Sequence, residues 1–254
     1  MNVLVIGAGS IGSVVVKECQ DMECVKTCFV MDRHRPNIKQ LERRYKKVQP
    51  VSDLNYALKQ VDLVVEAASQ EAVKEYGLQA LEAGAELVIM SVGALVDEGL
   101  RDALYSASGK NRIYLPTGAL CGLDAVVNAS HAGIEKVTLT TRKPPKSLNM
   151  EVDKNTVVFQ GPAAEAVKRF PKNVNVAATL SLASAGFQKT EIKLVCDPDI
   201  DQNIHEIRFQ GPAGELVGIS RNVPSPDNPG TSYLAALSAA AAVRKLCSKV
   251  WIGI

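Results

Sequence analysis

The chain has 254 residues, of which 46% are hydrophobic and 22% are charged, and its formal net charge is +2 at pH 7. This is the composition of an ordinary globular enzyme that is long enough for two domains. The sequence has no basic stripe interleaved with aromatic residues, so it does not support nucleic-acid binding, and no apolar run approaches the ~18 residues of a membrane span.

An apolar run over Val3–Ile6 predicts a strand, and a glycine-rich turn and an apolar-periodic helix follow it directly. The turn has the spacing G-x-G-x-x-G. In dinucleotide-binding folds the first glycine permits the tight turn, the second lets the pyrophosphate approach the backbone, and the third lets helix and strand pack closely. The N–H groups at the start of such a helix bind phosphate. The cofactor-binding residues predicted here are Gly7, Gly9, Ser10, Ile11 and Gly12.

A second predicted strand, Val25–Asp32, ends on an acidic residue twenty positions after Gly12. Asp32 is expected to accept hydrogen bonds from an adenosine ribose, which favours NAD because a 2′-phosphate would meet its negative charge. The next three residues are Arg33, His34 and Arg35. An arginine here can bind a 2′-phosphate, but a solvated basic turn explains the three residues equally well. We therefore expect Asp32 and Arg33 to contact the cofactor, NAD to bind and NADP to be tolerated.

Helices and strands are predicted to alternate through the rest of the first half, which indicates a parallel sheet with right-handed crossovers. The predicted helices are 38–45, 54–58, 71–83 and 97–107, and the strands are 62–67, 86–90 and 113–116. Ligands of such sheets lie at the carboxyl ends of the strands. The small-residue segments after two strands are therefore expected to contact the cofactor, although ordinary tight loops would look the same. Their candidate residues are Ala68, Ser69, Gln70, Ser91 and Gly93.

The periodicity changes after about residue 130. Strands are predicted over 136–141, 156–160, 191–196, 205–210 and 215–220, with helices over 163–170 and 176–185. This pattern indicates a mixed sheet with helices on one face. The predicted fold is therefore α/β. A Rossmann-type domain spans 1–116 and is completed by a C-terminal helix within 231–254, and a substrate-binding α+β domain spans 117–230.

The six cysteines lie in apolar surroundings and lack the C-x-x-C pairing of metal sites. We therefore expect reduced thiols, a cytoplasmic protein and no metal site. A homodimer is also expected.

Several longer segments have a common pattern. They are 116–125, 161–166 continuing through 170–179, 203–207 and 228–232. In this order, and over nearly the whole chain, they resemble L-aspartate dehydrogenase. The resemblance implies an NAD(P)-dependent enzyme that interconverts L-aspartate with oxaloacetate and ammonia through iminoaspartate, a precursor used in NAD biosynthesis. It also implies a catalytic role for His205 and nicotinamide-side contacts for Ala119 and Asn175. One departure is Gly230, where the family usually has lysine.

Residue chemistry points to the same histidine. His205 combines a strand position in the second domain with polar neighbours, Asn203 and Glu206. An imidazole titrating near neutrality can take a proton from a substrate ammonium or activate the water that hydrolyses an imine. A histidine on a strand is also often structural. His34 belongs to the basic turn, and His131 ends a helix, where capping explains it.

A dicarboxylate substrate needs cationic or hydroxyl partners. Thr141 and Arg142 lie at a predicted strand end, where solvated charge is the alternative explanation for Arg142. Thr231 and Ser232 precede the final helix, whose N-terminus favours anions. The predicted substrate-binding residues are Thr141, Arg142, Asn203, Thr231 and Ser232.

Alternative functions remain at this point. An aldehyde dehydrogenase would use Cys121 as nucleophile and His205 as base, but Cys121 has apolar neighbours and lacks the polar partner that activates a nucleophilic thiol. Another NAD(P)-dependent reductase, of the dihydrodipicolinate reductase or homoserine dehydrogenase type, has a similar layout, although the paired-histidine motif of the former is absent. A non-catalytic dinucleotide-binding sensor would keep the glycine turn and would need no histidine.

Overall fold

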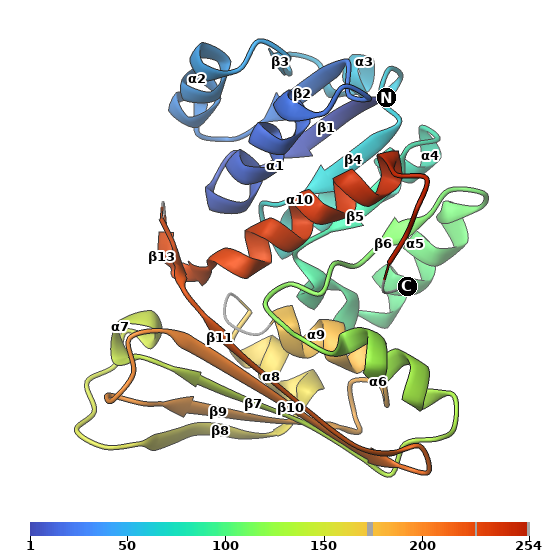
Figure 1. Cartoon of the computed structure of the whole chain (residues 1–254). Coiled ribbons are helices and arrows are strands. Elements are labelled where there is room, and N and C mark those ends of the chain that lie inside the picture. Colours follow the sequence, from blue (N-terminus) through green and yellow to red (C-terminus); the bar gives the residue numbers. More distant parts are fainter. Residues whose placement is uncertain (172–174, 227, 253–254) are drawn as a thin grey trace. The chain divides into compact units, whose positions relative to one another are not determined.

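The computed structural model describes residues 1–171, 175–226 and 228–252 (Figure 1). The chain folds into two compact units. The first consists of Met1–Pro116 with Ala236–Ile252, and the second includes Thr117–Ala235. Residues 231–235, which the sequence assigned to the first domain, belong to the second unit. Strand β13 (Asn228–Ser232) pairs there with β12 (Pro224–Ser225).

The first unit contains a parallel sheet with the strand order β3-β2-β1-β4-β5-β6. Its strands are β1 (Asn2–Ile6), β2 (Thr27–Met31), β3 (Val48–Pro50), β4 (Leu63–Glu66), β5 (Glu86–Ile89) and β6 (Ile113–Tyr114). This is the strand order of dinucleotide-binding folds, in which ligands lie at the carboxyl ends of the strands where the order reverses. The predicted Rossmann-type sheet is confirmed.

Helices cover both faces of this sheet (Figure 1). Their bounds are α1 (Ser10–Asp21), α2 (Arg35–Arg44), α3 (Leu54–Leu58), α4 (Gln70–Glu82), the 3-10 helix η1 (Val92–Val96), α5 (Glu98–Ser108) and α10 (Tyr233–Cys247). On one face Val3 and Val5 pack with Val15 of α1 and Val243 of α10. The C-terminal helix therefore completes the core of the first unit.

Two cysteines of the first unit form a disulfide. Cys24, in the turn after α1, is bonded to Cys247 at the end of α10, with 6.4 Å between their Cα atoms. The prediction of six reduced thiols is wrong for this pair. The reason is that α10 packs beside α1, which brings together two residues 223 positions apart. The remaining described cysteines, Cys19, Cys28, Cys121 and Cys196, are free.

The second unit is built on a mixed sheet with the order β11-β10-β7-β9-β8. Its strands are β7 (Lys136–Lys143), β8 (Thr156–Pro162), β9 (Thr190–Cys196), β10 (Asn203–Gly211) and β11 (Gly214–Asn222). The pair β7–β9 is parallel and the other pairs are antiparallel. The α+β fold predicted for this region is confirmed.

Helices cover one face of this second sheet (Figure 1). They are α6 (Leu123–Ser130), α8 (Ala163–Arg169) and α9 (Asn175–Leu182), and a short helix α7 (Pro145–Leu148) follows β7. Side chains alternate between the two faces along each strand, so Val137, Leu139 and Ile207 are buried beneath the helices. The other face exposes apolar side chains, including Val157, Val217 and Ile219.

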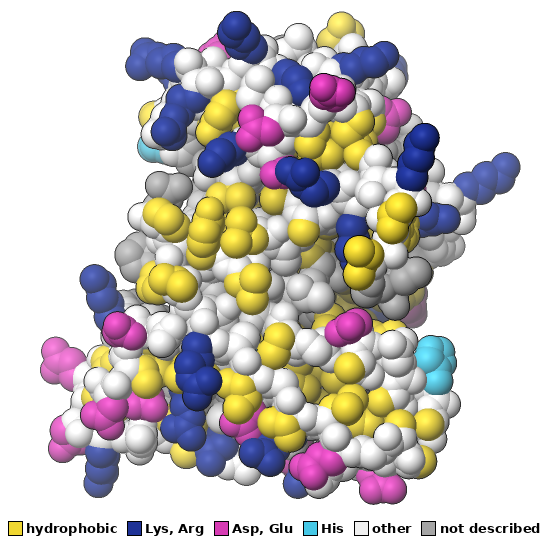
Figure 2. Space-filling model, viewed as in Figure 1, with side chains coloured by type: hydrophobic (Ala, Val, Ile, Leu, Met, Phe, Trp, Pro, Cys, Tyr) yellow, Lys and Arg dark blue, Asp and Glu magenta, His cyan; other side chains and the backbone are white. Residues whose placement is uncertain are grey.

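Within the part of the chain that is described, no helix combines the length and the apolar character required to cross a bilayer. On the face drawn in Figure 2, basic and acidic side chains are interspersed. This distribution accords with the small net charge of the chain.

Candidate functional site

The glycine turn has the geometry that its spacing predicts. Gly7 adopts a φ of +97°, and a Cβ added to Gly12 would lie only 1.8 Å from the carbonyl oxygen of Gly7. Neither position accepts a side chain, because the first needs left-handed backbone and the second needs close helix–strand packing. A Cβ added to Gly9 would meet nothing within 4 Å. The middle glycine therefore leaves open space over the turn.

Asp32 braces this turn from the end of β2. Its carboxylate accepts hydrogen bonds of 2.6 Å from the backbone N–H groups of both Ala8 and His34, and Asn37 Nδ2 lies 3.4 Å from it. The aspartate thus links the glycine turn to the start of α2. An ionised carboxylate has about four acceptor positions, so these bonds leave capacity for a ribose hydroxyl. The bracing role was not predicted from the sequence.

A cavity of ≈ 420 Å³ opens beside the turn. Ligand pockets are typically ~300–1,000 Å³. Besides residues of β1 and α4, its lining includes six predicted cofactor contacts: Gly7, Gly9, Asp32, Arg33, Ala68 and Ser69. Arg33 is largely exposed and forms an ion pair with Glu75 at 3.0 Å. The other predicted contacts of this unit lie at helix starts or in η1: Ser10 and Ile11 in α1, Gln70 in α4 and Gly93 in η1.

Glu66 was not singled out from the sequence, yet it ties together two loops at the carboxyl ends of the strands. It is 2% exposed at the end of β4. Its Oε1 accepts bonds from Ala68 N at 2.8 Å, Ser69 N at 2.9 Å and Ser91 Oγ at 2.9 Å, while its Oε2 accepts from Ser91 N at 2.9 Å. Burial raises the pKa of this carboxyl, although the bonds oppose the shift. Ser69 also caps α4 by accepting from Ala72 N.

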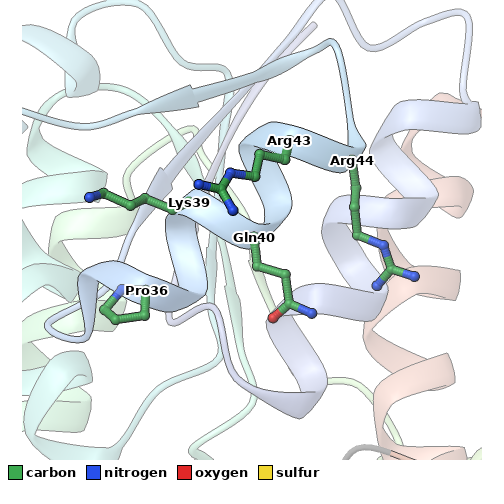
Figure 3. Close-up of a pocket in the computed structure, with 5 residues that line it drawn as sticks. All are labelled: Pro36, Lys39, Gln40, Arg43 and Arg44. Carbon is green, nitrogen blue, oxygen red and sulfur yellow. The ribbon is translucent and has the colours of Figure 1, made fainter.

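A second cavity, of ≈ 360 Å³, lies on the outer surface of α2 and contains none of the predicted site residues. It is lined by Pro36, Lys39, Gln40, Arg43 and Arg44. Figure 3 shows the side chains of Lys39 and Arg44 extending in different directions from the helix. The cations do not converge on one point, so this cavity is an exposed basic helix surface.

In the second unit, strand register places polar residues in a row beneath the helices. His205 of β10 lies opposite Thr141 of β7 and Ser220 of β11. All three side chains are buried, and His205 Nδ1 lies 3.0 Å from Thr141 Oγ1. Burial, with a smaller contribution from the nearby ammonium of Lys143, lowers the pKa of His205 to about 3. The imidazole is therefore neutral at physiological pH.

Asn203 lies at the next position of the same face, opposite Asn222 of β11. Its Nδ2 donates to Ser232 Oγ over 3.3 Å. Its Oδ1 is buried and has no hydrogen-bond partner among the described residues. A buried acceptor without a partner is costly, so this oxygen suits a donor from a ligand. Thr231 precedes Ser232 in β13.

The backbone of Ala119 is attached to the same end of the sheet. Its carbonyl oxygen accepts bonds from Ser220 Oγ at 2.7 Å and Asn222 Nδ2 at 3.3 Å. Ser220 lies opposite His205 and Asn222 lies opposite Asn203, so these two bonds hold Ala119 beside the polar row. Asn175, the other residue implied by the family resemblance, begins α9.

The structure does not bring Arg142 to this polar row. Alternation along β7 places it on the opposite face from Thr141, where its Nη1 lies 3.4 Å from Asp197 Oδ2. Its neighbour Lys143 is instead buried on the His205 face. Burial lowers the pKa of Lys143 to about 8. Arg142 was predicted from the sequence to bind substrate, and Lys143 was not.

The other reactive side chains lie elsewhere. His34 and His131 are exposed. A Cβ added to Gly218 would lie 3.3 Å from Cys121 Sγ, and Gly218 pairs with Ile207, so Cys121 lies beside a different position of the sheet from His205. Among the described residues, no group of three or more His, Cys, Asp or Glu side chains is arranged to hold a metal ion.

Comparison with known proteins gives matches over the whole chain. Residues 7–116 match the family described as homoserine dehydrogenase, NAD binding domain, and residues 124–246 match the family described as aspartate dehydrogenase, C-terminal. An L-aspartate dehydrogenase of Methanosarcina barkeri is 42% identical over 269 residues, covering 100% of this chain and 99% of the relative. One of Methanothermobacter thermautotrophicus is 41% identical over 258 residues, covering 100% and 98%.

A solved structure gives the same result. The crystal structure of aspartate dehydrogenase from Thermotoga maritima matches with a TM-score of 0.82 and 33% sequence identity, and the match covers 99% of both chains. Both halves of the chain, in sequence and in fold, therefore have dehydrogenase counterparts.

Proposed function

This chain belongs to the L-aspartate dehydrogenase family, and from that premise we propose that it catalyses the NAD(P)-dependent oxidative deamination of L-aspartate. The products are oxaloacetate and ammonia, formed through iminoaspartate, and the reverse reaction is a reductive amination that feeds NAD biosynthesis. The observation that carries the proposal is the buried row of Thr141, His205 and Asn203, in a chain aligned throughout with such enzymes.

The first unit fits a dinucleotide. The open space over Gly9 and the N–H groups at the start of α1 suit a pyrophosphate, and the remaining acceptor capacity of Asp32 suits a ribose hydroxyl. The adjoining cavity extends to Ala68 and Ser69. When bound, the nicotinamide ring supplies the redox chemistry by accepting a hydride from the α-carbon of aspartate. NAD and NADP are both proposed as cofactors, with Ala119 and Asn175 on the nicotinamide side.

His205 is proposed as the group that moves protons. With Nδ1–H donating to Thr141 Oγ1, the other ring nitrogen, Nε2, is left as an acceptor. A neutral imidazole in this tautomer can take a proton from the substrate ammonium, so that the nitrogen lone pair assists loss of the hydride. After releasing that proton to solvent, the neutral ring can take a proton from the water that attacks the imine carbon and return it to the nitrogen, which leaves as ammonia. Thr141 orients the ring.

Asn203 is proposed to bind the amino group of the substrate. Its buried Oδ1 accepts a hydrogen bond from the ammonium, while its Nδ2 stays bonded to Ser232. Thr231 and Ser232 remain proposed substrate contacts. Arg142 is not given this role, because its side chain lies on the other face of β7 and pairs with Asp197.

We also propose that the protein is a homodimer and works in the cytoplasm. The exposed apolar side chains of Val157, Val217 and Ile219 on the uncovered face of the second sheet support self-association. The four free cysteines support a reducing compartment, whereas the Cys24–Cys247 disulfide argues against one. Sedimentation of the purified protein tests the dimer.

A substrate panel tests the proposed activity. We expect NADH or NADPH formation with L-aspartate, and little with D-aspartate, L-alanine, L-glutamate or L-homoserine at equal concentrations. Preference for homoserine would instead favour the homoserine dehydrogenase alternative. Cofactor binding without turnover of any amino acid would favour the non-catalytic sensor.

A further inference from the structure

The loop 117–122 opens the second unit and lies between β6 and α6, so no helix or strand ladder holds it. The carbonyl oxygen of Ala119, in the middle of this loop, accepts from Ser220 Oγ at 2.7 Å and from Asn222 Nδ2 at 3.3 Å. A carbonyl oxygen has two acceptor positions, and both are filled by side chains that lie 101 and 103 residues further along the chain. The loop is therefore tied to β11 at Ala119.

Ser220 and Asn222 also bond to each other, which closes a triangle of hydrogen bonds with Ala119. Asn222 Nδ2 donates to Ser220 Oγ over 3.2 Å. The serine can accept this bond because its own hydrogen is donated to Ala119. Both side chains are buried, and a buried polar side chain is costly unless it is paired. A fully paired buried network specifies one arrangement, so the triangle selects one position of the loop.

The same face of β11 fits the loop at a third position. Side chains alternate along the strand, so Gly218 lies on the face that carries Ser220 and Asn222. A Cβ added to Gly218 would lie 3.0 Å from the carbonyl oxygen of Cys121, which is closer than ordinary van der Waals contact. Three successive positions on one face of β11 are therefore matched to this loop.

The triangle lies directly across from the residues that are proposed to act on the substrate. Ser220 is opposite His205 in the antiparallel pair of β10 and β11. Asn222 is opposite Asn203 in the same pair. The Cβ atoms of directly opposed residues are about 4.5–5.5 Å apart. The side chains that hold the loop and the side chains of the polar row are thus fixed by one strand pairing, and loss of the triangle would free the loop without freeing His205.

We propose that Ser220 and Asn222 are positioning residues for hydride transfer, which hold the loop at Ala119 and thereby set the place of the nicotinamide beside the polar row. The inference rests on the proposed function, in which Ala119 lies on the nicotinamide side. Transfer of a hydride from the α-carbon of aspartate needs close, aligned reacting carbons, and a displacement of about 1 Å can lower the rate about 10²-fold. Neither side chain has to contact the reacting atoms, because each acts through the backbone of the loop.

NADH and ADP-ribose test this placement together, because ADP-ribose contains the adenosine half of the cofactor and lacks the nicotinamide. Their dissociation constants are measured by titration calorimetry on the full chain with Ser220→Ala and Asn222→Leu combined. Leucine has nearly the size of asparagine and cannot donate a hydrogen bond. We expect the dissociation constant for NADH to rise about threefold to tenfold, the range for loss of a neutral hydrogen bond, and that for ADP-ribose to stay unchanged. Turnover of L-aspartate should fall about tenfold to a hundredfold.

Ser130→Ala is the matched control. Ser130 Oγ also donates to a backbone carbonyl, that of Val127, over 2.7 Å, but it lies at the end of α6 and outside the polar row. This variant should leave turnover and the binding of both ligands unchanged. The single variants Ser220→Ala and Asn222→Leu each leave Ala119 one of its two bonds, so each should lose less than the double variant. Thermal melts check that every variant folds.

NADH binding or turnover within about twofold of wild type in the folded double variant would overturn the proposal. It would also be overturned if ADP-ribose binding weakened as much as NADH binding, since a merely structural role would affect both ligands alike. An equal effect of Ser130→Ala would do the same. If the double variant does not fold, the two single variants are judged by these criteria, and failure of both to fold would show that the bonds serve the fold and would overturn the proposal.

The outcome for the wild type separates this inference from the proposed function. Turnover of L-aspartate by the wild type, with unchanged NADH binding in the variants, would reject this inference alone. Absence of turnover in the wild type, with NADH binding selectively weakened in the variants, would reject the proposed function instead.

Discussion

Replacing Glu66 by glutamine tests whether this buried carboxyl holds the two loops beside the cofactor cavity. Three of its four hydrogen bonds are accepted by Oε1, and the fourth, from Ser91 N, is accepted by Oε2. Glutamine can keep the first three with its amide oxygen. Its NH₂ group must then face the N–H of Ser91, which loses its acceptor. A buried unsatisfied donor costs about 1–3 kcal/mol, so we expect Glu66→Gln to destabilise the fold by about that amount at pH 5.

The loss of stability caused by Glu66→Gln should become smaller as the pH rises. Burial raises the pKa of Glu66 above its ordinary value of 4.5, so the folded state holds this proton to higher pH than the unfolded state. The stability that wild type gains from this raised pKa is fully present below pH 4.5, and it is lost as the pH rises through the folded-state pKa of Glu66. Glutamine does not titrate. The stability advantage of wild type over Glu66→Gln should therefore shrink between pH 5 and pH 8.

Urea unfolding of both proteins at the two pH values measures this difference, because other titrating groups cancel between them. Glu82→Gln, on the exposed end of α4, is the control and should change stability little at either pH. Loosening of Ala68, Ser69 and Ser91 should also weaken NADH binding in Glu66→Gln. The reasoning would be refuted if the stability difference between wild type and Glu66→Gln stayed constant or grew with pH. It would also be refuted if Glu82→Gln lost as much stability as Glu66→Gln.

Three more predictions concern other parts of the molecule. Asp32→Ala should shift cofactor preference from NAD toward NADP by about 1–3 kcal/mol, because the variant lacks the negative charge expected to face the ribose. The ratio of the Michaelis constants for NAD and NADP measures this shift, and an unchanged ratio would place Asp32 outside the ribose site. Cys121→Ala should keep near-wild-type turnover with L-aspartate, and loss of turnover in a folded variant would revive a thiol mechanism. Cys247→Ser should lower the free energy of unfolding by about 2–4 kcal/mol under non-reducing conditions; an unaltered urea midpoint would show that the bond to Cys24 does not form in solution.

The cofactor site of the first unit was largely predictable because its signals are local. Gly7 and Gly12 are required by backbone geometry within one turn, and Asp32 follows at a spacing set by one strand–helix–strand repeat. Glu66 gave no comparable signal. Its partners are backbone N–H groups of two separate loops, one of them 25 residues away, and backbone donors leave no trace in sequence.

The substrate site depends on which face of the sheet a side chain occupies. Consecutive residues of a strand lie on opposite faces, so an error of one residue places a side chain on the wrong face. Arg142 and Lys143 are adjacent and both basic, so the sequence could not choose between them. Pairing of Thr141 with His205 determines that the lysine shares the face of the histidine. The Cys24–Cys247 bond was hidden for a similar reason, since it depends on the packing of α10 beside α1.

The most direct test of the account is the turnover of His205→Asn compared with its affinity for NADH. Asparagine keeps a polar side chain of similar size, so the fold and the dinucleotide site should be preserved. We expect turnover of L-aspartate to fall by about 10²- to 10⁴-fold, the usual contribution of a proton-transfer group, while the dissociation constant for NADH stays unchanged. Turnover within a few fold of wild type would contradict the assignment of His205 and, with it, the mechanism proposed for the polar row.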